Sequence, residues 1–149
     1  SKGEREDISG KTIKEIVEAK GYRVTRSVIL PDDEESLSIE MKYMADELKV
    51  DLILTTGGTG FSKRDVTPEA TIKICDRMAN GIAEAIRYYS LSITPRAMLS
   101  RAVSGIRGET LIINLPGSPK AVKEALDYAM DSIDHGLEIL KGHAHDCAR

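Results

Sequence analysis

The sequence predicts an α/β protein with a Rossmann-like three-layer sandwich, in which helices cover both faces of a mostly parallel sheet. Helical stretches alternate with short apolar runs along the chain, which is typical of βαβ units. One of these runs, residues 50–56, is almost entirely apolar, as expected for a strand that is covered on both faces. A chain of 149 residues is long enough for one core, so we expect a single domain over residues 1–149.

The first part of the chain predicts a helix, a strand and a second helix. The first helix runs from about Asp7 and ends at Gly21, in a position where helices favour glycine. Residues 22–30 are rich in Val and Ile and are a strand candidate. The second helix is expected because apolar residues recur at helical spacing, at Leu37, Met41, Met44 and Leu48.

The second part continues this alternation. The apolar strand at residues 50–56 leads into a glycine-rich loop, and a third helical region then runs from about Thr67 to about Ile93, with a break at Asn80-Gly81. Residues 102–107 and 110–115 predict a hairpin that turns at Gly108-Glu109. A last helix over residues 119–140 has one apolar stripe, formed by Val122, Leu126, Ala129, Ile133, Leu137 and Leu140.

Composition excludes several classes of protein. The net charge of −3 argues against a general nucleic-acid binder, and no apolar run approaches the roughly 20 residues of a membrane span. The polar first residues do not form a signal peptide, so we expect a cytoplasmic protein. Cys75 and Cys147 lack the spacing of a zinc site, and no histidine (His135, His143, His145) stands beside a candidate nucleophile. Covalent catalysis is therefore not expected.

The motif TTGGTGFSKRDVTPEAT, residues 55–71, is the strongest functional signal. Glycines at 57, 58 and 60 let the backbone turn sharply off the strand and expose N–H groups to a ligand. Thr67 followed by Pro68 indicates a helix start, with the threonine hydroxyl as the N-cap. A glycine loop and a helix N-terminus at the carboxyl end of one strand together predict a phosphate-binding site.

Asp65 lies between these two anion-binding elements, where a lone carboxylate would repel phosphate. A magnesium ion resolves the conflict, because Mg²⁺ favours one or two carboxylates together with phosphate oxygens. Lys63 and Arg64 could add positive charge beside it. Alternatively, Asp65 only caps the next helix and its basic neighbours face water.

A second junction of the same design is INLPGSPKA, residues 113–121. Ser118 is the N-cap candidate, Pro119 the first helical residue and Lys120 a nearby cation. If the two strands are parallel, both junctions lie at one edge of the sheet, as an enzyme that joins two phosphorylated molecules would require. The alternative is an ordinary strand-to-helix turn.

Two further segments carry candidate residues. LPDDEES, residues 30–36, places Asp32 and Asp33 at the same edge, where one caps the helix and Asp32 could bind metal beside Asp65. The alternative is a pair of acids at a solvated helix start. Ser104-Gly105, within SRAVSGIRG, suggests a loop near a ligand.

Together these motifs resemble the MoaB/MogA family, whose relatives include the G domains of gephyrin and of plant Cnx proteins. SKGERED, TTGGTGFSKRDVTPEAT, SRAVSGIRG and NLPGSPKA follow one another in the family's order, so the resemblance covers nearly the whole chain. It implies molybdenum-cofactor biosynthesis, with adenylate transfer from Mg-ATP to molybdopterin that releases pyrophosphate. It also implies a homotrimer or a dimer of trimers.

The resemblance also implies roles for individual residues. The loop of Gly57, Gly58, Thr59 and Gly60 would hold nucleotide or pterin phosphate. Asp65 would be the essential acidic residue and Asp32 the second, both near Mg²⁺. The pterin side of the pocket would be shaped by Ser104, Asn114, Pro116, Gly117 and Ser118.

One departure concerns the start of the chain. Family members carry a strand that ends in a Ser-Asp pair before the SKGERED-like segment, and no such strand stands in the numbered sequence. We expect that the numbering omits this strand, because a buried parallel strand is needed to cover the core on both flanks. The alternative is a polypeptide that cannot form the complete site.

Two other functions stay open, and one expectation concerns assembly. The chain could be a non-catalytic molybdopterin-binding paralogue of the MoaB type, or a scaffold of the same fold. It could also be an unrelated nucleotide-binding module in which GGTG is only a turn. We expect self-association, because Ile82, Ile86 and Leu91 are apolar residues that could lie at an interface.

Overall fold

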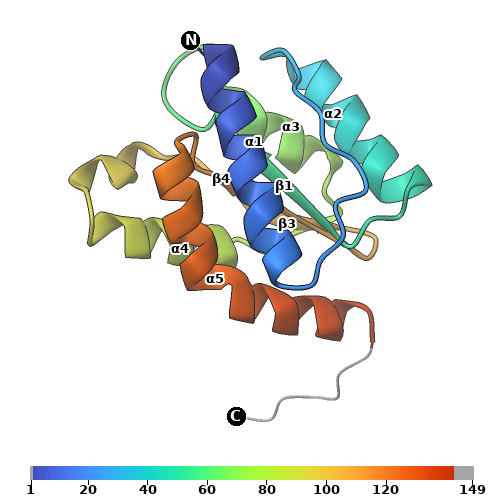
Figure 1. Ribbon diagram of the computed structural model, residues 1–149. Helices are drawn as coiled ribbons and strands as arrows, with labels where there is room; N and C mark the ends of the chain where they lie inside the picture. The colour runs from blue at the N-terminus through green and yellow to red at the C-terminus, as the bar shows by residue number, and fades with distance from the viewer. Residues whose placement is uncertain (1, 143–149) are drawn as a thin grey trace.

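The computed structural model describes residues 2–142, with side chains from residue 8 onward, and these residues form a three-layer α/β sandwich (Figure 1). The central sheet has four strands in the order β1-β4-β3-β2, namely β1 (Leu52–Thr56), β2 (Arg77–Met78), β3 (Ser104–Arg107) and β4 (Thr110–Leu115). The predicted α/β class with helices on both faces is confirmed.

Strand β4 forms the centre of both halves of the core, because its side chains alternate between the two faces of the sheet. Leu111, Ile113 and Leu115 belong to a cluster with α4 (Gly81–Leu91) and α5 (Pro119–Leu140), and α1 (Lys2–Ala19) packs against α5. Ile112 belongs to the opposite cluster, with α2 (Glu34–Lys42) and α3 (Thr67–Ile74). Burial of each such side chain contributes roughly 1.5–3 kcal/mol.

The predicted helix boundaries hold best where capping residues mark them. Helix α5 begins after Ser118, whose side chain accepts a hydrogen bond from the Ala121 N–H. Gly21 follows α1 with a φ of 92°, the left-handed conformation that favours glycine after a helix. The second predicted helix is α2 followed by a single π-helical turn, Tyr43–Glu47. Between residues 2 and 142, no helix combines the length and apolar character of a membrane span.

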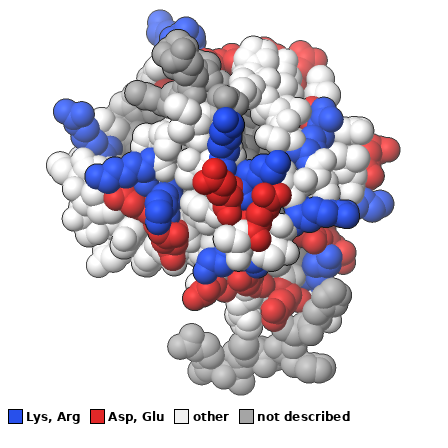
Figure 2. All heavy atoms as spheres, in the orientation of Figure 1, with Lys and Arg blue, Asp and Glu red and all other residues white. Residues whose placement is uncertain are grey.

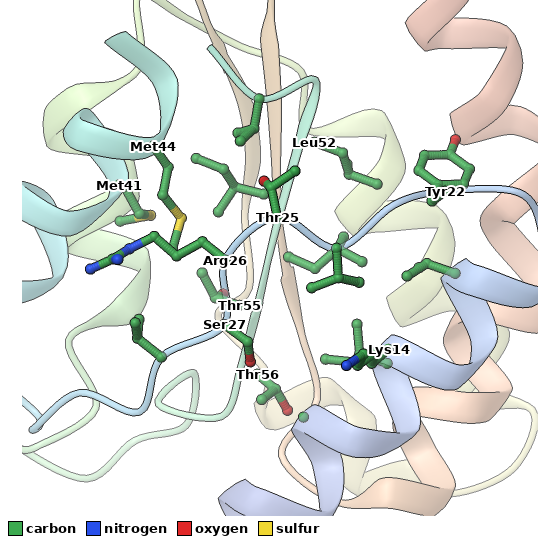
Figure 3. A pocket seen from close by; sticks show the side chains of 18 of the residues that line it. Lys14, Tyr22, Thr25, Arg26, Ser27, Met41, Met44, Leu52, Thr55 and Thr56 are labelled. Carbon is green, nitrogen blue, oxygen red and sulfur yellow. The ribbon is translucent and has the colours of Figure 1, made fainter. Parts of the chain in front are cut away.

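The strand predicted at residues 22–30 is wrong. From Arg23 to Leu30 the backbone makes no hydrogen bond to another backbone group of the described chain. A strand requires a hydrogen-bonded neighbour, and a cavity separates this segment from β1 (Figure 3). Residues 22–30 have high β propensity, but without a pairing strand they form no regular structure.

The sheet is mixed, and not mostly parallel as predicted. Only β1 and β4 pair in parallel, whereas β3 pairs antiparallel with both β4 and β2. Residues 22–30 add no further parallel strand, and β2 replaces part of the predicted third helix. Helix α3 ends at Ile74 because the next residues bind the edge of β3, through Asp76 N–H to Ile106 O (2.8 Å) and Ala79 N–H to Ser104 O (2.9 Å).

Candidate functional site

The loops that follow β1 and β4 lie side by side at one edge of the sheet. Thr56 pairs with Leu115 at the ends of the parallel strands, and the Thr56 hydroxyl donates to Pro116 O at 2.6 Å. A Cβ atom on Gly117 would lie 3.4 Å from the Gly57 Cα, so two glycines allow the backbones this close approach. The two junctions therefore meet, as expected for the carboxyl ends of parallel strands.

The glycine loop folds back onto the start of α3. Gly57 and Gly58 have φ angles of 81° and 70°, and the Gly58 carbonyl accepts the Thr67 N–H at 3.1 Å. A Cβ atom on Gly58 would lie 2.3 Å from the Thr67 hydroxyl oxygen. Thr67 is therefore not the N-cap that the sequence predicted. Val66 holds that position without a side-chain cap, because the threonine side chain packs against the loop.

Four consecutive amides of this loop are available to a ligand. Within residues 2–142, the N–H groups of Gly58, Thr59, Gly60 and Phe61 have no hydrogen-bond partner in the protein. Unpaired backbone donors beside a helix N-terminus bind phosphate and other anions. The loop thus has the chemistry that its glycines predicted.

Asp65 closes the far end of the loop. Its carboxylate accepts the Ser62 N–H at 3.0 Å, and a Cβ atom on Gly60 would lie 2.9 Å from its Oδ2. Asp65 thus caps the turn that begins at Ser62. It does not cap helix α3, so the alternative that it caps the next helix is wrong. Lys63 and Arg64 are exposed beside it, where they can attract anions.

Of the paired acids, Asp33 is the N-cap of α2. It accepts hydrogen bonds from the Ser36 N–H (2.9 Å) and hydroxyl (2.7 Å), and these bonds lower the pKa of its carboxyl group. Asp32 lines the same cavity as Gly57, Gly58 and Thr67. Asp65 is not among the described residues that line this cavity. The structure therefore does not bring Asp32 and Asp65 to one cavity.

The cavity has a volume of about 1160 Å³ and lies along the outer edge of β1. Figure 3 shows the segment of Thr25 to Ser27 passing in front of β1, with Met44 to one side and Lys14 of α1 to the other. One end of the cavity reaches the glycine loop through Thr56 and Gly57.

Ser104 and Asn114 are buried behind the loops and satisfy internal hydrogen bonds. The Ser104 hydroxyl donates to Ala79 O (2.6 Å) and accepts the Ala83 N–H (3.0 Å). The Asn114 amide donates to the hydroxyls of Thr55 and Thr71, each at 3.0 Å, and its oxygen accepts the Val103 N–H. Both residues therefore stabilise the segments behind the loops through internal hydrogen bonds. That they contact the pterin stays a prediction.

The second loop is half-buried at the surface and tied to α1. Ser118 caps α5, as predicted, by accepting the Ala121 N–H at 3.2 Å, and Lys120 is exposed next to it. The Gly117 carbonyl accepts the hydroxyl of Ser9, which is fully buried, at 2.9 Å. Sequence reasoning missed Ser9, whose only signal was its place in the segment that follows SKGERED.

Arg101 is the second residue that sequence reasoning missed. It stands in the SRAVSGIRG motif, and its side chain contacts Gly60, Asp65 and Glu69 of the glycine loop and α3. The motif shows an arginine three residues before Ser104. Its partner Gly60 lies 41 residues earlier in the chain, and sequence spacing does not predict that contact. Gly105 of the same motif packs against Cys75, where a Cβ atom would lie 2.6 Å from Sγ.

The thiol of Cys75 is not poised as a nucleophile. Burial raises the pKa of the Cys75 thiol to about 11, so it is protonated at neutral pH. Among the described residues there is no group of three or more His, Cys, Asp or Glu side chains that could hold a metal ion by itself. Cys147, His143 and His145 lie outside the described residues.

Basic and acidic side chains are interspersed on the face shown in Figure 2. This mixture fits the net charge of −3. The fold and the paired loops define a class of protein: an α/β protein whose glycine loops meet at the carboxyl edge of its sheet, the place where proteins of this class bind small molecules.

Comparison with known proteins makes the assignment specific. The chain belongs to the family described as probable molybdopterin binding domain, which matches residues 1–135. It is 41% identical over 147 residues to a molybdopterin adenylyltransferase of Helicobacter pylori, covering 96% of this chain and 82% of the relative. It is 47% identical over 117 residues to gephyrin of Dictyostelium discoideum, covering 78% of this chain and 16% of gephyrin.

The solved structures agree with the sequence relatives. The molybdopterin biosynthesis enzyme MoaB of Thermus thermophilus superposes with a TM-score of 0.87 at 42% identity, covering 94% of this chain and 88% of that one. The resemblance to the MoaB/MogA family is therefore confirmed.

Proposed function

We propose that this protein transfers adenylate from ATP to molybdopterin in molybdenum-cofactor biosynthesis. The observation that carries the proposal is the pairing of two loops: Gly57, which directly precedes the free amides of residues 58–61, lies against Gly117 of the second loop. Each of the two loops can hold one of the two phosphorylated substrates. The relatives named molybdopterin adenylyltransferase support the same reaction.

The reaction balances without a covalent enzyme intermediate. An oxygen of the terminal phosphate of molybdopterin forms a bond to the α-phosphorus of ATP. The bond from that phosphorus to the oxygen bridging to the β-phosphate breaks, and pyrophosphate leaves with the electron pair. Because the attacking oxygen is already an anion, a general base is hardly needed. Catalysis then depends on orientation, for which roughly 7–11 kcal/mol is available, and on electrostatics.

The acidic residues have a proposed role in metal binding. Asp65 and Asp32 would hold Mg²⁺, with phosphate oxygens as its remaining ligands, because one or two carboxylates suffice for such a site. When bound, magnesium neutralises the charge of the polyphosphate. Lys63, Arg64 and Lys120 are exposed near the loops and would steer anionic substrates toward them.

The assembly and location of the protein are part of the proposal. We place it in the cytoplasm as a homotrimer or a dimer of trimers. Support for an oligomer comes from apolar side chains that the described chain leaves exposed on neighbouring elements, namely Tyr88, Leu91, Ile93, Met98 and Leu99. Neither a nucleic acid nor a membrane is a proposed partner.

A second candidate function is molybdopterin binding without turnover. The contact of the Asp65 carboxylate with the Ser62 N–H favours it, because this bond occupies part of the carboxylate that would hold the metal. Such a paralogue would still bind molybdopterin through the two glycine loops.

Pyrophosphate release separates the two functions. We expect the purified protein to release pyrophosphate when Mg-ATP and molybdopterin are both present, and to release none with either one alone. Molybdopterin binding without pyrophosphate release would instead identify the non-catalytic function. Absence of molybdopterin binding would contradict both, and would leave a nucleotide-binding module in which GGTG is only a turn.

A further inference from the structure

Arg101 makes four kinds of contact with the glycine loop and the start of α3. Its own N–H donates to Thr59 O at 2.7 Å. Its guanidinium donates through Nε to Gly60 O (2.7 Å) and through Nη2 to Asp65 O (2.6 Å). It also pairs with the Glu69 carboxylate, at 2.6 Å between Nη1 and Oε2. One residue from the segment before β3 therefore spans the loop from residue 59 to the first turn of α3.

These contacts set the direction of the free amides. In a planar trans peptide unit the carbonyl and the N–H point in opposite directions. Because Arg101 binds the carbonyls of Thr59 and Gly60, the N–H groups of Gly60 and Phe61 must point away from it. Those two amides are among the four without a partner in residues 2–142.

The charge of Arg101 is already matched by a carboxylate. Glu69 pairs with the guanidinium, and this hydrogen bond lowers the pKa of Glu69. The fork also holds two carbonyl oxygens, which leaves little of it to receive a phosphate. Arg101 thus differs in kind from Lys63 and Arg64, which are exposed and can act as steering cations.

We infer that Arg101 is a positioning residue, which orients the N–H groups of Gly60 and Phe61 toward the phosphate of a bound substrate without contacting that substrate. The inference rests on the proposed function for the identity of the ligand. The inference about how the loop is held does not depend on the proposed function, because it can be tested in the free protein.

Two variants of Arg101 and one matched control test this inference. Arg107 has the same kind of fork, since it pairs with Asp46 at 2.7 Å and donates to Ile74 O at 2.7 Å, but it holds the other end of α3. R101A and R107A therefore remove similar contacts at different places. R101K keeps the positive charge but lacks the planar fork with which the guanidinium binds the Gly60 and Asp65 carbonyls in a fixed geometry.

In the free protein, ¹⁵N relaxation of Gly60 and Phe61 reports how rigidly their N–H groups are held. We expect order parameters near the rigid value of about 0.85 for both amides in the parent protein and in R107A. In R101A the value should fall below about 0.6 at Phe61, whose peptide unit loses the bond from the guanidinium to Gly60 O, and should change less at Gly60, because the backbone N–H of residue 101 still binds Thr59 O. Unchanged order parameters in R101A would overturn the inference, whatever the catalytic activity of the protein. Thermal unfolding of each variant shows that the fold persists.

With Mg-ATP and molybdopterin, kinetics give the second readout. We expect kcat/KM to fall about 10- to 100-fold in R101A, because misplaced groups cost that much, and by less than about twofold in R107A. R101K should stay at least about tenfold below the parent. Full rescue by R101K would show that charge alone matters and would overturn positioning. A parent protein without turnover would contradict the proposed function and leave the relaxation result to decide the role of Arg101.

Discussion

At Asp65, one carboxylate closes a turn and is also the candidate ligand for magnesium. It accepts the Ser62 N–H at 3.0 Å, a bond that the amide oxygen of asparagine can also accept. Asp65→Asn should therefore keep the fold and lose the charge that the metal needs. We expect turnover to fall at least about 100-fold, which is about 2.7 kcal/mol of barrier, in a steady-state assay at saturating magnesium.

Molybdopterin binding supplies the control for this variant. Its affinity should be kept or increased in Asp65→Asn, because a negative charge near the phosphate is removed. Turnover at close to the parent rate would mean that Asp65 only closes the turn, and that the metal is held elsewhere.

Gly58 tests the close approach of the loop to α3. It has a φ of 70°, and a Cβ atom there would lie 2.3 Å from the Thr67 hydroxyl oxygen. Gly108 has a φ of 59° with no atom within 4 Å of a built Cβ, so it isolates the cost of the backbone conformation. Chemical denaturation should show that Gly108→Ala loses about 1–2 kcal/mol, and that Gly58→Ala loses a further 1–3 kcal/mol. Equal losses would mean that Thr67 moves aside freely.

Single residues were predictable where the chemistry is local. Asp33 and Ser118 cap helices that start within three residues of them, so their roles follow from short spacing. Arg101 and Ser9 act on residues 41 and 108 positions away, and only the folded chain places their donors next to those carbonyls. The roles of Ser104 and Asn114 as internal braces likewise depend on burial that a sequence pattern does not reveal.

The elements were predictable where helices and strands find their neighbours within the described chain. Helix α5 has the predicted bounds, and the β3–β4 hairpin turns at Gly108 as predicted. Residues 22–30 have strand composition but no partner, and α3 stops at Ile74 because β2 binds an edge of the sheet. Both errors concern long-range pairing, which propensity does not encode.

The outer edge of β1 gives a prediction at this scale. In a parallel pair successive amides point to opposite sides, and the Gly57 N–H points toward β4, where it donates to Leu115 O. Ile53 and Thr55 share that direction, so the N–H groups of Leu54 and Thr56 face the cavity. We expect hydrogen exchange to be at least about tenfold faster at Leu54 and Thr56 than at Ile53 and Thr55. Equal protection would mean that another segment pairs with this edge.

The surface of the described chain includes exposed apolar side chains that do not pack into its core. The prediction of self-association named Ile82 and Ile86, but Ile86 is 4% exposed and Ile82 packs against the same core cluster. These two residues are therefore intramolecular, and only Leu91 of the three, at 41%, is well exposed. The stronger candidates are Tyr88 and Met98, which are 76% and 63% exposed on the contacting elements α4 and Pro95–Leu99.

Light scattering tests this surface. We expect an oligomer at micromolar concentration and a monomer after Tyr88→Glu together with Met98→Glu, because two charges would be buried without partners. Exposed positions tolerate substitution within about 0.5 kcal/mol, so the variant should stay folded. A monomeric parent protein would rule out an obligate oligomer, and an oligomeric variant would place the interface elsewhere.

The central claim is that this protein joins the α-phosphate of ATP to the phosphate of molybdopterin. Its most direct test is ATP labelled at the α-phosphate, incubated with magnesium, molybdopterin and the purified protein, followed by isolation of the pterin. We predict that the label moves to molybdopterin, one adenylate for each pyrophosphate released, and that omission of magnesium stops the transfer. Molybdopterin that binds the protein and stays unlabelled would contradict the account.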